Sequence, residues 1–143
     1  AADLLARLAA SLPPGLEPRS LDTYDERRAV AARVTGAYYE VEVETADLAD
    51  PTALFEAVSR FRSAPSLVVE ERRADKVRSL DVKEYVAAVD ARALADGCYA
   101  VSFRVAVTPH GSARPERVLG ALEVLGAPRL NMVRGRRTRI ELS

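Results

Sequence analysis

Short stretches of the chain alternate between apolar and polar residues, which is the period of a half-buried β-strand. The clearest stretch is 37–45, where one tyrosine and two valines share a face while Tyr38 and three glutamates share the other. In 98–107 the apolar residues from Tyr99 to Val107 share one face in the same way. These patterns predict two strands, each with one buried face.

Turn signals divide further extended stretches into hairpins. Asp96-Gly97 is a strong signal of this kind, because both residues tolerate positive φ. Charged turns at 72–75 and 134–136 separate the other candidate strands. We expect three hairpins: 66–71 with 76–81, 88–94 with 98–107, and 129–133 with 137–142.

Other segments repeat apolar residues at helical spacing. A first helix at 3–11 ends before Pro13-Pro14-Gly15. A second begins after Asp50, which is placed to cap it, and ends near Ser63. Its predicted apolar stripe is Leu54, Phe55, Val58 and Phe61. We also expect a helix from Pro115 to about Leu125, one helical turn at 82–87, an extended segment at 16–24, and either a short helix or irregular structure at 26–34.

Helices that interrupt consecutive hairpins one at a time predict an α+β fold. We expect an antiparallel sheet with the helices on one face, in a ferredoxin-like arrangement. The chain contains no fixed-period repeat, low-complexity tract or Pro/Ser linker, so residues 1–143 are expected to form a single domain.

Composition narrows the class of protein. The chain has 143 residues, 48% of them hydrophobic and 29% charged, and 21 basic residues balance 21 acidic ones. These values are typical of an ordinary globular domain and exclude a disordered tail. The apolar stretches are far shorter than the ~20 residues of a membrane span, so we expect a soluble, cytoplasmic protein with no membrane partner.

The sequence offers no catalytic, metal or cofactor site. Cys98 and His110 are the only residues of their types, and no glycine-rich phosphate loop is present. His110 as a general base is one interpretation, but a solvated loop histidine is preferred because a nucleophile and an orienting group are missing. Cys98 is expected to be a packing residue. The helix that starts after Arg114 offers free amides to an anion, although an ordinary capped start is preferred.

Charge is distributed unevenly along the balanced chain. The segment 40–50 is acidic without a basic residue, and 132–140 is basic without an acidic one. The preferred interpretation is that the sheet brings them together, with Glu40 or Glu42 facing Arg137 or Arg139 across strands. The alternative is a surface that receives RNA phosphates. Its candidate anion-binding residues are Arg72, Arg73, Lys76, Arg78, Lys83, Arg114, Arg134, Arg136, Arg137 and Arg139.

Three motifs resemble one known family. They are AASLPPGLE near the amino terminus, RADKVRSLDVKEYV from Arg73, and RPERVL from Arg114. In this order, and with an arginine-rich end, they are similar to the radical-SAM-linked family of uncharacterised bacterial proteins. The resemblance covers the carboxy-terminal half of such proteins, so it implies that the chain is a fragment whose amino-terminal half is missing. The chain also opens inside an amphipathic helix without a starting Met.

The resemblance implies an accessory domain associated with radical SAM enzymes, and it places Lys76, Arg78, Asp81, Arg114, Pro115 and Glu116 on family-like positions. A radical SAM cluster needs three close cysteines, which Cys98 alone does not supply. Our first hypothesis is a non-catalytic recognition module that binds RNA, with a radical SAM protein as a further partner.

The alternative hypothesis is a structural half-domain that packs on its missing amino-terminal half and on a protein partner, without nucleic acid. It predicts an unpaired strand edge or an apolar face, and possible homodimers of the fragment. Neutral charge and an aromatic content of only 6% weaken the RNA hypothesis.

Overall fold

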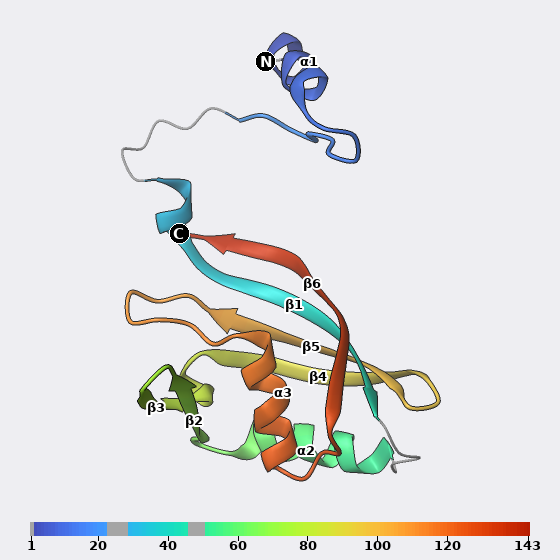
Figure 1. The fold of residues 1–143 in the computed structure, drawn as a ribbon, viewed down its shortest axis with the longest axis vertical. Coiled ribbons are helices and arrows are strands. Elements are labelled where there is room, and N and C mark those ends of the chain that lie inside the picture. The colour runs from blue at the N-terminus through green and yellow to red at the C-terminus, as the bar shows by residue number, and fades with distance from the viewer. Residues whose placement is uncertain (1, 23–28, 46–50) are drawn as a thin grey trace. The chain divides into compact units, whose positions relative to one another are not determined.

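The computed structural model describes residues 2–22, 29–45 and 51–143, without the side chains of Pro51 and Arg73. The chain divides into two compact units, Ala1–Ala32 and Arg33–Ser143 (Figure 1). The first contains α1 (Ala2–Ser11), which confirms the first predicted helix. No residue of α1 is buried, and Leu4 is 54% exposed. The single domain over 1–143 stays a prediction.

The second unit contains two sheets and two α-helices, which confirms the α+β class. After η1 (Val30–Arg33), which straddles the boundary, the elements are β1 (Val34–Thr45), α2 (Pro51–Ser63), β2 (Val68–Arg73), β3 (Lys76–Asp81), η2 (Val82–Glu84), β4 (Val86–Ala95), β5 (Cys98–Ala106), α3 (Pro115–Val124) and β6 (Leu130–Leu142). The main sheet has the order β4-β5-β1-β6 and is antiparallel throughout. This order is compatible with a ferredoxin-like arrangement, which stays a prediction.

The buried face of the main sheet follows the predicted alternation. Val41 lies opposite Val101 in the register of β1 and β5, and both are 0% exposed. Leu54 and Phe61 of α2 and Leu122 of α3 join them in one core. Both helices therefore cover the same face of the sheet, and Figure 1 shows α3 lying across it. Burial of these apolar side chains is the main source of stability.

The hairpin of β2 and β3 forms its own two-stranded sheet, and it follows α2 and precedes β4 along the chain. Its end is held by Asp81, whose carboxylate accepts hydrogen bonds from the amides of Leu67 and Lys83 at 2.9 and 3.0 Å. The predicted turn at the start of 82–87 is confirmed as η2. The hairpin of β4 and β5 is also confirmed, with Gly97 at φ +74° in its turn.

The predicted hairpin at the carboxy terminus is wrong. Residues 130–142 form one strand, β6, which pairs with β1 from Thr45↔Leu130 to Val34↔Leu142. The Arg-Gly-Arg segment is locally compatible with a turn, but the long β1 offers pairing along the whole segment. Shifts of register at Tyr38/Tyr39 and Glu42/Val43 absorb the extra residues of β6 as bulges.

Two smaller details of the sequence interpretation are also wrong. Phe55 is 39% exposed, because the apolar stripe of α2 runs through Leu54, Ala57, Val58 and Phe61 instead. Val107 is 38% exposed because β5 ends at Ala106. The expected cap Asp50 and residues 26–28 of the segment 26–34 lie outside the described residues, whereas Val30–Arg33 form the short helix η1. None of the helices in the described ranges has the length and hydropathy of a membrane span.

Candidate functional site

The face of the main sheet opposite to α2 and α3 carries stripes of charge. Strand β1 contributes glutamates at alternate positions, and β6 contributes arginines. The polar side chains of β4 and β5 complete this face. We call it the charged face. It consists of Tyr38, Glu40, Glu42, Glu44, Asp90, Arg92, Cys98, Ser102, Arg104, Arg134, Arg136, Arg139 and Glu141.

Ion pairs across β1 and β6 neutralise most of this charge. Arg134 Nη2 lies 2.6 Å from Glu42 Oε1, and Arg136 Nη2 lies 3.7 Å from Glu40 Oε1. Arg92 reaches the same oxygen of Glu40 from β4, at 3.4 Å. The preferred interpretation, acidic and basic segments paired within the sheet, is thus confirmed. The expected partners Arg137 and Arg139 are wrong, because β6 is continuous and its bulges shift the register.

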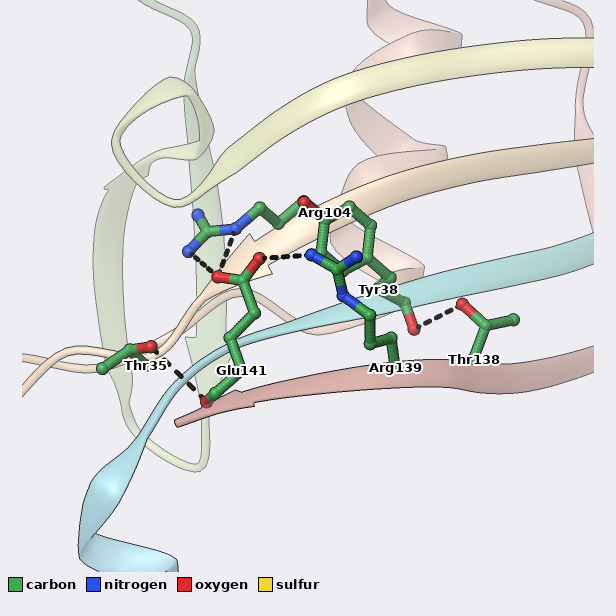
Figure 2. Close-up of polar contacts among 6 residues, drawn as sticks. All are labelled: Thr35, Tyr38, Arg104, Thr138, Arg139 and Glu141. Atoms are coloured by element: carbon green, nitrogen blue, oxygen red, sulfur yellow. Dashed lines mark hydrogen bonds and ion pairs between the residues drawn. The ribbon is translucent and has the colours of Figure 1, made fainter. Parts of the chain in front are cut away.

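A cluster of hydrogen bonds on the charged face surrounds Glu141 (Figure 2). Arg104 donates to Glu141 Oε2 from Nε at 3.1 Å and from Nη2 at 2.7 Å, and Arg139 donates to Oε1 at 3.1 Å. These hydrogen bonds, led by that from Arg104, lower the pKa of Glu141 to about 2. The same contact raises the pKa of Arg104. The guanidinium of Arg139 also lies 4.5 Å from the centre of the Tyr38 ring.

Gly36 of β1 leaves room for the guanidinium of Arg104 in this cluster. A Cβ atom at that position would lie 2.7 Å from Nη2 of Arg104, so the guanidinium occupies the room that a side chain would fill. The alternation expected in 98–107 implies that Arg104 points away from the apolar face, but it does not identify a partner for this side chain. Glu141 stands 37 residues away along the chain, and only the sheet brings the two together.

Strand β6 is an edge of the main sheet in the described part of the chain. Apart from Leu130 at its start and Glu141 near its end, its residues are exposed, including Val133 at 56% and Ile140 at 47%. An edge strand presents unpaired N–H and C=O groups to any incoming strand. The unpaired edge expected for an interaction half-domain is therefore present.

The predicted anion-binding residues do not form one surface. Arg72, Lys76 and Arg78 are exposed on the separate hairpin of β2 and β3, and the side chain of Arg73 lies outside the described residues. Arg114 is exposed at the start of α3. Their binding of an anion stays a prediction.

The remaining basic candidates have intramolecular contacts. Lys83 donates from Nζ to the carbonyl of Phe61 at 2.7 Å and lies 4.6 Å from the centre of its ring. Arg137 lies on the helix side of β6, 5.6 Å from the centre of the Tyr39 ring. It borders a hollow of about 420 Å³ that α3 leaves beside the strand. The arginines of β6 are thus divided between the two faces of the sheet.

Within the described ranges, neither His110 nor Cys98 lies in an arrangement of residues suited to catalysis. His110 is exposed in the turn from Thr108 to Gly111, where its backbone amide donates to Thr108 Oγ1 at 3.2 Å. Cys98 is half-buried, with its sulfur 4.0 Å from Glu44 Oε1. Residues 2–22, 29–45 and 51–143 contain no cluster of three His, Cys, Asp or Glu side chains suited to a metal.

Comparison with known proteins identifies a family. A family model described as "Uncharacterized protein conserved in bacteria (DUF2344)" matches residues 1–115. The match includes β1 to β5 and ends at the first residue of α3. No curated protein and no solved structure matches the chain.

Proposed function

The chain belongs to the family of uncharacterized proteins conserved in bacteria (DUF2344), and from this premise we propose that it is a non-catalytic recognition domain that binds a protein along the edge of β6. The observation that carries the proposal is this long, exposed edge strand. Because β6 lies beyond the matched residues, the proposal rests on the geometry of this chain.

Strand addition is the mode of binding that such an edge supports. An extended partner segment gains affinity from main-chain hydrogen bonds and specificity from its alternate side chains. On β6 the exposed apolar side chains Val133 and Ile140 lie near both ends of an arginine-rich centre. These features suit a polypeptide, which offers both backbone groups and apolar side chains.

The charged face supports a protein partner better than RNA. Each of its five arginines, Arg92, Arg104, Arg134, Arg136 and Arg139, forms an ion pair with Glu40, Glu42 or Glu141. RNA binding gains its affinity from cations that neutralise phosphates and release counterions. Paired arginines would have to exchange carboxylates for phosphates, which reduces that gain.

The resemblance described above implies a class of partner. We propose that the protein bound at β6 is a radical SAM protein, which would supply the three cysteines of the cluster, whereas this chain has one cysteine. The alternative partner is the amino-terminal half that the same resemblance implies.

Site-specific photocrosslinking in the native host tests the proposal. A photoreactive amino acid replaces Val133 on β6, and a matched variant carries it at Val77, which is 58% exposed on the β2–β3 hairpin. We expect a radical SAM protein to be crosslinked from position 133 and not from 77, with or without ribonuclease. Crosslinks to RNA alone, or equal protein crosslinks from both positions, would refute binding at the edge of β6.

A further inference from the structure

The charged face has an order that points to the chemistry of the partner strand. The glutamates of β1 form an acidic stripe beside the arginines of the neighbouring β6, and Arg92 reaches Glu40 from β4, on the far side of β5. Opposite charges on neighbouring strands stabilise a sheet, whereas like charges destabilise it. In the described part of the chain β4 and β6 are the two edges of the sheet, and the basic stripe lies on the edge formed by β6.

We propose that β6 binds a partner strand with acidic residues at alternate positions, which continues the order of charge by one more strand. The proposal rests on the proposed function and deepens it, since it names the chemistry of the strand that the edge accepts. The acidic side chains of this strand would lie beside Arg134, Arg136 and Arg139.

These three arginines retain capacity for a second carboxylate. Each intramolecular pair joins one terminal nitrogen to one carboxylate oxygen, whereas a guanidinium carries five N–H donors. Their side chains remain 73%, 70% and 66% exposed. Ion pairs with two partners already occur on this face, since Oε1 of Glu40 contacts both Arg92 and Arg136.

The same charges disfavour a second copy of this chain as the occupant. Antiparallel pairing of β6 with another β6 about the centre of its arginine segment would place Arg134 opposite Arg139, and both of these residues lie on the charged face. Like charges in these positions oppose self-association, as charged edges commonly do in natural sheets. An acidic strand turns the same arginines into attractive contacts.

Peptide binding to the full chain tests the proposal. The probe is a fluorescent nine-residue peptide, Thr-Glu-Val-Glu-Thr-Glu-Val-Glu-Thr, with fluorescence anisotropy as the measurement and backbone amide shifts of β6 to locate the site. One control peptide replaces each Glu by Gln, and another keeps the charge but has Pro at both Val positions, which prevents regular strand pairing.

We expect only the uninterrupted acidic peptide to bind, with shifts confined to β6 and its neighbours. The double variant Arg134→Gln with Arg139→Gln should weaken binding at least tenfold. Arg92→Gln serves as the matched control, since Arg92 is 64% exposed and also pairs with Glu40, but lies on β4. This variant should bind the peptide as the wild type does.

Equal binding of the proline peptide would overturn strand pairing, and equal binding of the Gln peptide would overturn the acidic chemistry. No binding, or a dimer of the chain that is lost in the Arg134/Arg139 double variant, would overturn the proposal as well. Crosslinking of a protein from position 133 together with any of these results would leave the proposed function standing. The two proposals therefore fail separately.

Discussion

Replacement of Lys83 by Met tests whether this lysine stabilises the fold or serves a basic surface. The carbonyl of Phe61 lies in the last turn of α2, and its usual partner would be the amide of the residue four positions later. That residue is Pro65, which has no N–H. The ammonium of Lys83 supplies the missing donor at 2.7 Å and lies over the Phe61 ring.

The expected cost of Lys83→Met is about 2 kcal/mol. A hydrogen bond to a charged group contributes about 1.5–3 kcal/mol, and a cation–π contact adds roughly 0.5–1 kcal/mol. The half-buried position of Lys83 reduces both contributions. Each kcal/mol lowers the Tm of a domain of this size by roughly 4 °C. Urea unfolding followed by circular dichroism measures the loss directly.

Lys76→Met is the matched control, because Lys76 is exposed at the turn of the β2–β3 hairpin. Its free energy of unfolding should stay within about 0.5 kcal/mol of the wild type. Equal stability of the two variants would show that the contact of Lys83 with α2 contributes nothing. A loss of RNA binding on Lys83→Met at unchanged stability would instead support the basic surface.

Three further predictions concern the Glu141 cluster and the core. Titration of Glu141 by NMR should give a pKa of about 2, and Arg104→Gln should raise this pKa toward the ordinary 4.5. Because the pKa is lowered in the folded state, the cluster stabilises the fold above about pH 4.5, and this contribution is lost as the pH falls toward 2. Gly36→Ala should displace the Arg104 guanidinium and raise the same pKa, and an unchanged titration would contradict the close approach. Leu122→Ala should cost about 2–5 kcal/mol because the side chain is fully buried, whereas Leu8→Ala in α1, at 38% exposure, should cost under about 0.5 kcal/mol; equal losses in thermal unfolding would refute this reading of the core.

Local pattern was sufficient for most elements of the fold. The alternation in 37–45 predicted both the strand β1 and its buried face, because successive side chains of a strand point to opposite sides. Helical spacing predicted α1, α2 and α3, and Asp96-Gly97 predicted the turn between β4 and β5. Each of these signals acts over a few residues, which is why it can be read without the rest of the chain.

The candidate site depends on contacts between segments that are distant along the chain. The sequence suggested that acidic and basic segments pair, which the sheet confirms, but it misassigned the partners. The correct pairs, such as Glu42 with Arg134, follow from a register that two bulges shift. No local signal in 129–142 reports whether Arg-Gly-Arg turns or continues, since the answer depends on the length of β1.

The sequence by itself thus determined the helices, most of the strands and the buried face of the sheet, because these follow from spacing along the chain. Only the tertiary structure decided that β6 is one continuous edge strand, that Glu141 meets Arg104, and that Lys83 binds the end of α2. These features arise from contacts between segments distant in sequence, whose free energy exceeds the weak local preference of each segment.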